Sequence, residues 1–243
     1  MEIRPGIHRL GAGMVNSYIL EETGELTIVD AAMAGFWSDL PAELAAMGRS
    51  LDDVRALVLT HGHSDHIGFA ERFRRERHIT PKVHELDAAL ARGEMPNPAK
   101  GMGKVKFGPF VRFILLGLRK GGLRTTPLAE VATFGDGATL DVPGAPRVVL
   151  VPGHTPGSAV LHVPDFDTLF VGDAMATLAV TEGRTGPQIA PFTADASEAL
   201  ASLDRLAGLE ARWLLPGHGE PWTGGVESAI SEVRRTAASA RAA

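Results

Sequence analysis

Short apolar runs separated by turn residues form the clearest pattern along this chain. Runs rich in Val, Ile and Leu predict strands, and they cover residues 17–20, 26–29, 55–60, 79–83, 138–142, 147–151, 159–163, 168–171 and 213–215. Apolar residues at helical spacing predict helices, and these cover residues 38–47, 68–77, 85–92, 195–206 and 226–240. Because strands and helices mix in both halves, we expect a layered α/β protein with sheets packed together and helices outside.

The composition and charge narrow the class of protein. With 243 residues, 44% of them hydrophobic and 22% charged, the chain can bury a sizeable core and is not intrinsically disordered. Its formal charge of −5 argues against general nucleic-acid binding. The segment MEIRPGIHRL lacks the apolar core of a signal peptide, and the run at 113–118 is too short to cross a bilayer. We therefore expect a cytoplasmic protein without a transmembrane segment or a nucleic-acid partner.

A dense cluster of candidate metal ligands follows the strand predicted over 55–60. It contains His61, His63, Asp65 and His66. Residues two apart project to the same side of an extended backbone, so the first three can converge, and His66 can approach from the turn into the next helix. The chain has no cysteine, so any metal must be held by imidazole or carboxylate groups. These groups suit a zinc-like divalent ion.

Three further candidates share a context of an apolar strand, a glycine and then a ligand-type side chain. They are His154, Asp173 and His218. A His-rich surface turn would explain one cluster, but not the same context at four places, so we interpret the set as a metal site. The remaining histidines lack this context and are interpreted as surface or structural residues: His8, His78, His84 and His162.

These motifs resemble those of the metallo-β-lactamase fold superfamily. The run from His61 to His66 resembles its HxHxDH motif, and the later Gly-His, Gly-Asp and Gly-His pairs resemble its remaining metal motifs. Asp30 resembles its early aspartate at a strand end. The resemblance implies a single domain over residues 1–243, folded as a four-layer αββα sandwich. The basic and apolar segment in its middle further predicts a helical cap insertion at about 94–130.

The resemblance also implies a role for each residue. His61, His63 and His154 would hold a first metal, whereas Asp65, His66 and His218 would hold a second. Asp173 would bridge the two, and Asp30 would orient the ligand loop. The implied cofactors are two divalent ions, with zinc as first choice and iron, manganese or cobalt as alternatives. A hydroxide activated between the metals would then attack the substrate, with Asp65 as a catalytic residue that orients it.

Differences from the better-known branches of this superfamily reduce the number of reactions to consider. True β-lactamases lack the bridging aspartate, and the run at 153–158 resembles glyoxalase II, yet the 25 residues after His218 are too few for the helical substrate domain of that enzyme. Acyl-homoserine lactonases use a late tyrosine, whereas the only tyrosine here is Tyr18. We expect hydrolysis of an ester, thioester or lactone in a partly apolar small molecule. The alternatives are a phosphodiesterase or nuclease, a mono-iron oxidoreductase like persulfide dioxygenase, a β-lactamase, or a binding module without activity.

The segment 100–124 is basic and apolar at once. It contains seven Lys and Arg residues, and no acid occurs between Glu94 and Glu130. Apolar residues at helical spacing could line a substrate pocket if the helix caps the metals: Phe107, Phe110, Val111, Ile114, Leu115 and Leu118. Two other interpretations stay open. The helix could simply pack on the domain, or it could serve as a membrane-surface or homodimer interface.

Overall fold

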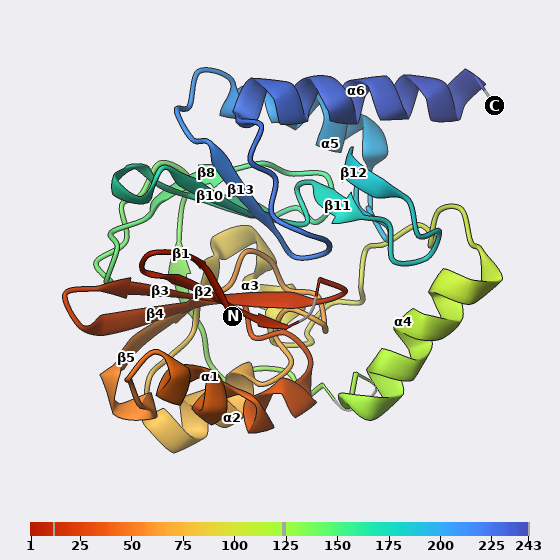
Figure 1. Ribbon diagram of the computed structural model, residues 1–243. Helices are drawn as coiled ribbons and strands as arrows, with labels where there is room; N and C mark the ends of the chain where they lie inside the picture. The colour runs from red at the N-terminus through yellow and green to blue at the C-terminus, as the bar shows by residue number, and fades with distance from the viewer. Residues whose placement is uncertain (12, 123–124, 243) are drawn as a thin grey trace.

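Two β-sheets stacked face to face form the centre of the molecule (Figure 1). The computed structural model describes residues 1–11, 13–122 and 125–242. The larger sheet has the strand order β1-β2-β3-β4-β5-β6-β7. Its strands are β1 (Glu2–Arg4), β2 (Ile7–Gly11), β3 (Asn16–Glu22), β4 (Glu25–Val29), β5 (Val54–Val58), β6 (Lys82–His84) and β7 (Ala132–Phe134). Pairing is antiparallel from β1 to β4 and parallel from β4 to β7.

The second sheet has the order β13-β10-β9-β8, and a short β11-β12 ribbon stands beside it. Its strands are β8 (Arg147–Leu150), β9 (Ala159–Val163), β10 (Thr168–Gly172) and β13 (Trp213–Pro216), and the ribbon contains β11 (Ala176–Leu178) and β12 (Thr185–Gln188). Buried side chains from both sheets fill the space between them, among them Leu20, Val58 and Phe170. Because β10 and β13 run parallel, their carboxyl ends lie at the same edge.

Helices cover the outer face of each sheet (Figure 1). On the larger sheet lie α1 (Leu40–Ala46) and α2 (Ala70–Arg77), and on the smaller one α5 (Ala196–Ser202) and α6 (Val226–Ala242). Leu44 and Phe73 join the first outer core, and Leu203 and Val233 join the second. The order of layers is therefore helix, sheet, sheet, helix, as the sequence predicted. Shorter elements connect the layers: α3 (Ala88–Ala91) and the 3-10 turns at 34–38, 51–53, 85–87, 164–166 and 203–206.

The structure corrects several predicted elements. The expected strand at 138–142 is absent; Thr139 only bridges Arg147, because a turn at Val142–Ala145 folds the chain back and Leu140 enters the core between the sheets. The strand expected at 79–83 begins only at Lys82, after Pro81. The helix expected at 85–92 is divided into a 3-10 turn and α3. The strands β1, β2, β7, β11 and β12 were not predicted, because their short mixed-polarity segments lack a clear period.

The helix α4 (Phe107–Arg119) lies beside the sandwich and buries none of its residues fully (Figure 1). The backbone holds it at both ends: Lys106 N donates to Thr181 O at 2.9 Å, and Gly35 N donates to Lys120 O at 2.7 Å. Part of the segment expected to form the insertion, residues 123–124, lies outside the described residues. Among the described residues, no helix has the length and apolarity required to span a membrane.

Candidate metal centre

Four strand ends from both sheets deliver the predicted ligands to one place. The loop after β5 carries His61, His63, Asp65 and His66. The chain after β8 carries His154, the chain after β10 carries Asp173, and the chain after β13 carries His218. All seven side chains gather at the edge where the two sheets meet, so every metal ligand that the sequence predicted is brought into one cluster.

The ligand atoms fall into three groups within which they lie no more than 4.8 Å apart. One group contains His61, His63 and His154, and another contains Asp65, His66 and His218. The third joins Asp173 to one histidine from each of the other two, His61 and His66. This arrangement is the one expected for two neighbouring cations with a carboxylate between them.

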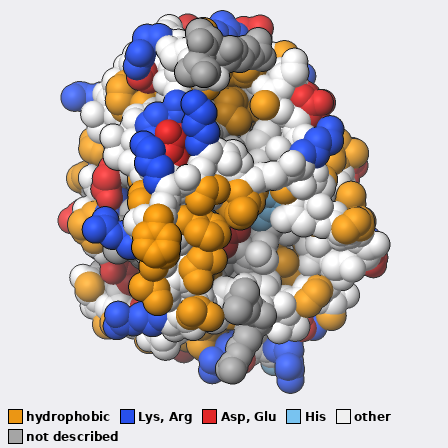
Figure 2. All heavy atoms as spheres, turned by 90° about the vertical axis from the view of Figure 1, so that its right-hand side faces the viewer, with side chains coloured by type: hydrophobic (Ala, Val, Ile, Leu, Met, Phe, Trp, Pro, Cys, Tyr) orange, Lys and Arg blue, Asp and Glu red, His pale blue; other side chains and the backbone are white. Residues whose placement is uncertain are grey.

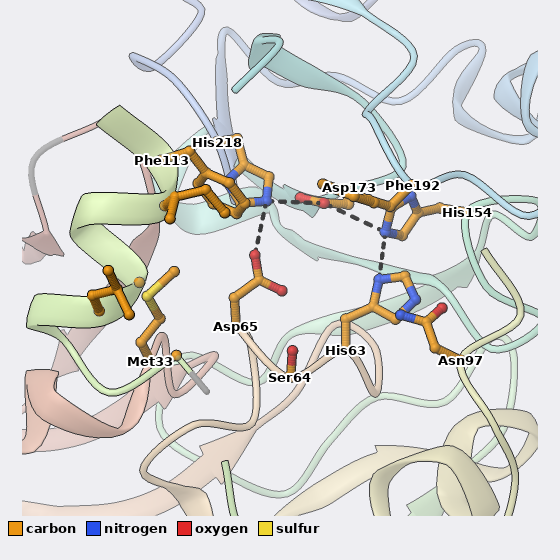
Figure 3. A pocket seen from close by; sticks show the side chains of 14 residues that line it. Met33, His63, Ser64, Asp65, Asn97, Phe113, His154, Asp173, Phe192 and His218 are labelled. Atoms are coloured by element: carbon orange, nitrogen blue, oxygen red, sulfur yellow. Dashed lines mark hydrogen bonds and ion pairs between the residues drawn. The ribbon is translucent and has the colours of Figure 1, made fainter. Parts of the chain in front are cut away.

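Asp173 lies at the centre of the cluster. Its Oδ2 is 3.2 Å from His218 Nε2 and 3.4 Å from His154 Nε2. Figure 3 shows both imidazoles pointing toward this carboxylate, with Asp65 3.4 Å from His218 on the other side. Only a glycine fits at position 217 beside this carboxylate, because a Cβ added to Gly217 would lie 2.5 Å from Asp173 Oδ1.

The donor set fits a metal ion because several of its buried polar atoms have no hydrogen-bond partner. Among the described residues, His61 Nε2, His63 Nε2, His66 Nε2 and Asp173 Oδ1 are buried and unpartnered. Native proteins rarely leave buried polar atoms without a partner unless an ion, a water or a ligand supplies one. Imidazole nitrogen and carboxylate oxygen are the donors that divalent transition metals accept.

Asp30 orients two of these histidines through its carboxylate. Its Oδ2 accepts from His66 Nδ1 at 2.8 Å and from Thr60 Oγ1 at 2.8 Å, and its Oδ1 accepts from Thr60 N at 2.7 Å. Thr60 Oγ1 in turn lies 3.1 Å from His61 Nδ1. Fixing Nδ1 in this way leaves Nε2 of both rings directed at the cluster, which is how proteins commonly prepare metal-binding imidazoles.

Two of the other imidazoles are held in the same manner, whereas His63 Nδ1 lies 2.9 Å from His154 Nε2. His218 Nδ1 lies 2.6 Å from the carbonyl oxygen of Met14, and His154 Nδ1 lies 3.0 Å from Thr193 Oγ1. Thr60, Thr193 and Met14 could not be predicted from the sequence, because a hydroxyl or a backbone carbonyl in a loop has no distinctive sequence pattern. Only the position of Thr60, directly before His61, could have indicated its role.

Asp87 is a buried carboxylate that the sequence analysis also missed. Its Oδ2 accepts from Gly62 N at 2.7 Å and from Thr155 Oγ1 at 2.8 Å, and its Oδ1 accepts from Gly157 N at 2.7 Å. It therefore ties the loop of His61 and His63 to the loop of His154. In the sequence, an aspartate before an Ala-rich helix reads as a helix cap, but its side chain makes no cap hydrogen bond to α3.

Replacing Asp87 with asparagine should weaken metal binding. The amide keeps the shape but cannot accept all three hydrogen bonds, so the two loops lose their common anchor. We expect metal affinity to fall by about 10–100-fold, the usual effect of disturbing groups that orient ligands. Chelator competition measures this, with Thr27→Val as a control that removes a buried hydrogen bond to Pro143 O. Equal loss of affinity in both variants, in step with a lowered Tm, would contradict the positioning role.

The electrostatics of the cluster divide the histidines into two kinds. Burial lowers the pKa of His154 to about 3 and the pKa of His61 well below its usual value. Burial acts in the same sense on His66 and His218, but nearby carboxylates outweigh it and raise their pKa values to about 10 and about 9. The carboxylates are Asp30 and Asp173 for His66, and chiefly Asp173 for His218. A cation that binds here must displace the protons on these two rings.

A cavity of about 290 Å³ opens directly onto the ligands. Its polar wall includes His63, Asp65, His154, Asp173 and His218, and its apolar wall includes Met33, Phe113, Ile114, Leu118 and Phe192. Of the pocket residues expected from the sequence, Ile114 and Leu118 line this cavity. The others on α4 do not: Phe107, Phe110, Val111 and Leu115. The reason is the rotation of α4, which turns Phe113 and Gly117 toward the cavity and leaves Phe107 and Leu115 exposed, while Phe110 and Val111 are half-buried away from the cavity wall.

The four remaining histidines lie outside the three ligand groups found among the described residues. His8 Nδ1 lies 2.9 Å from Glu43, and His78 ends α2 in a left-handed conformation. His84 is buried, and His162 Nε2 lies 3.2 Å from the carbonyl oxygen of Glu210. Each has a local structural environment, as the sequence analysis expected.

This chain is similar to known proteins in both sequence and fold. The sequence profile described as "Metallo-beta-lactamase superfamily" matches residues 10–218. The chain is 28% identical to the "Probable metallo-hydrolase YflN" of Bacillus subtilis (strain 168), over 92% of this chain and 87% of that protein. The metallo-beta-lactamase family protein TTHA1429 from Thermus thermophilus superposes with a TM-score of 0.70 and 26% identity, covering 99% of this chain and 81% of that one. The structure of TTHA1623 in a di-iron-bound form superposes with a TM-score of 0.62 and 26% identity, covering 91% and 96%.

Proposed function

This chain belongs to the metallo-beta-lactamase superfamily, and we propose that it hydrolyses the ester, thioester or lactone bond of a partly apolar small molecule with two bound metals. The family and the His/Asp cluster support a metal-dependent hydrolase in general. One observation carries the finer proposal: a single cavity has the ligand cluster on one wall and apolar side chains on the other. Substrate sites typically combine an apolar lining with a few placed polar groups.

The proposed ligands divide as the three groups suggest. His61, His63 and His154 would hold one cation, Asp65, His66 and His218 the other, and Asp173 both. When bound, such cations supply Lewis acidity, polarising a carbonyl oxygen and lowering the pKa of water toward neutrality. Zinc is our first choice, and iron is the main alternative, since a similar protein has been solved in a di-iron form.

Asp65 is the proposed catalytic residue of this chain. Its side chain is 21% exposed, whereas those of Asp173 and His218 are 4% exposed, so Asp65 is the more accessible of the two carboxylates on the cavity wall. With the cations bound, Asp65 would accept a hydrogen bond from a water in the cavity and orient it toward a carbonyl carbon. Phe113 and Phe192, whose ring centroids are 6.3 Å apart, would hold the apolar part of the substrate and exclude bulk water.

Longer acyl chains should be preferred substrates if this apolar wall binds them. Burying four methylenes contributes about 3 kcal/mol at about 0.8 kcal/mol each, which corresponds to more than a hundredfold in kcat/KM. We expect Phe113→Ser to reduce this preference, whereas Leu115→Ser, outside the cavity, should leave it unchanged. The measurement is kcat/KM for ester, thioester and lactone series of increasing chain length, together with metal analysis.

The same panel separates the alternatives. It includes a phosphodiester, a β-lactam and a test for oxygen consumption with a persulfide. Faster turnover of the phosphodiester or the β-lactam, or oxygen uptake with one iron per chain, would replace the proposal. We also propose a cytoplasmic location, as expected from the sequence.

A further inference from the structure

The outer face of α4 carries a contiguous apolar surface that no other part of the described chain covers. We call it the α4 stripe and define it as Phe107, Ile114, Leu115 and Leu118. Phe107 is 86% exposed, Leu118 59%, Leu115 57% and Ile114 45%. Single exposed apolar residues are ordinary, but a contiguous patch of this kind marks an interaction surface.

Exposed cations border the α4 stripe. Arg112 and Arg119, seven residues apart, follow one edge of the helix, and Lys100 and Lys104 precede it. Within the described part of the chain, these four make no ion pair. By contrast, Lys106 lies 3.7 Å from Glu182, and Lys120 pairs with Asp39. These four cations therefore form a basic fringe beside the stripe, without a directly paired carboxylate in the described chain.

The α4 stripe also continues into the cavity above the ligands. Ile114 and Leu118 belong to the stripe and line the cavity as well. Figure 2 shows this face: the hydrophobic patch lies next to a hollow in which a pale blue histidine is visible, and blue side chains stand around the patch. A molecule held against the stripe would thus lie at the entrance to the metal centre.

We propose that the α4 stripe docks on an anionic lipid bilayer surface. The apolar side chains would enter the boundary between headgroups and acyl chains, as in other helices that lie in the interface. The basic fringe would contact the anionic headgroups. Docking in this orientation places the cavity mouth at the lipid surface.

A second copy of this chain fits the stripe less well. A symmetric dimer would place α4 against α4 and bring Arg112 and Arg119 of each copy near those of the other. A helix of 13 residues is about 20 Å long, so its footprint is roughly 200 Å². Stable dimers usually bury about 800 Å² per partner.

Vesicle binding by the full metal-loaded protein tests the proposal. The probes are vesicles of phosphatidylcholine mixed with phosphatidylglycerol, and vesicles of phosphatidylcholine alone. We expect binding to the first and little to the second, with loss at high salt because the headgroup attraction is screened. Arg112→Gln with Arg119→Gln should weaken binding about 25-fold, at about fivefold per cation. Phe107→Ser with Leu115→Ser should weaken it by at least about tenfold.

Matched controls come from elsewhere on the surface. Leu86→Ser removes another exposed apolar side chain, and Arg55→Gln removes another exposed cation; both should bind like the unchanged protein. Equal binding to both vesicle types, or double variants that bind normally, would overturn the proposal. So would a dimer in solution that Phe107→Ser with Leu115→Ser dissociates, in the absence of vesicle binding.

The docking proposal and the proposed hydrolase can fail separately. Hydrolysis of a water-soluble short-chain substrate is measured on the same variants, and it should be unchanged because Phe107 and Leu115 lie outside the cavity. Vesicle binding without hydrolysis would therefore reject only the reaction, whereas hydrolysis without vesicle binding would reject only the surface. Circular dichroism confirms that each variant is folded.

Discussion

Replacing Asp173 with alanine should remove both metals and lower kcat/KM by at least about 10³-fold, which corresponds to roughly 4 kcal/mol. Among the described residues, this carboxylate belongs to the one ligand group that joins the histidines of the other two. Without it, two cations a few ångströms apart would repel each other with no negative charge between them. The measurement is metal content after dialysis, together with kcat/KM on the best substrate from the panel.

Asp173→Asn is the matched variant for this experiment. It keeps the size of the side chain and one oxygen but removes the charge, so it should retain more metal than alanine and still lose activity. Full activity of Asp173→Ala with two metals retained would show that this carboxylate does not bridge them.

Replacing His154 with alanine should have the second largest effect and should be more selective. His154 belongs to the group with His61 and His63 and to neither of the other two, so we expect loss of one metal and retention of the other. Hydrolysis should fall by about 10²–10³-fold, because one source of charge stabilisation at the reacting carbonyl is gone. Metal stoichiometry and kcat/KM, measured on the same preparation, test both parts of this prediction.

His162→Ala provides the control, since it also removes a largely buried imidazole but lies outside the ligand groups. It should keep both metals and nearly full activity. If His154→Ala retained two metals, or if His162→Ala lost them equally, the assignment of His154 to a separate cation site would be wrong.

The sequence predicted the candidate ligands well because their signal is local. His61, His63, Asp65 and His66 stand within six residues, and each later ligand directly follows a strand and a glycine. Asp87 has no such signal. Its partners, Gly62, Thr155 and Gly157, are far from it in the chain, and only the packing of two loops brings them together.

The orientation of α4 is a second feature that could not be predicted from the sequence. Its helical spacing was evident, but the helix is apolar on more than one side: Phe113 and Leu116 pack toward the body, whereas Phe107 and Leu115 face outward. Helical spacing indicates which residues share one face of a helix, but it does not indicate which face packs against the rest of the protein. The prediction of a strand at 138–142 was wrong for a related reason. Leu140 is buried in the core although the segment forms only an isolated bridge and no strand.

The placement of the ligands on both sheets also has a mechanical consequence. This chain has no cysteine and therefore no covalent cross-link. Cations shared between the loop after β5 and the ends of β10 and β13 would connect segments that are far apart in the chain, as a disulfide does. Cross-links that close such long loops contribute roughly 4–5 kcal/mol by restricting the unfolded chain. The metals would thus cross-link the two halves of the sandwich. The free energy of metal binding would then contribute to the free energy of unfolding of the whole molecule.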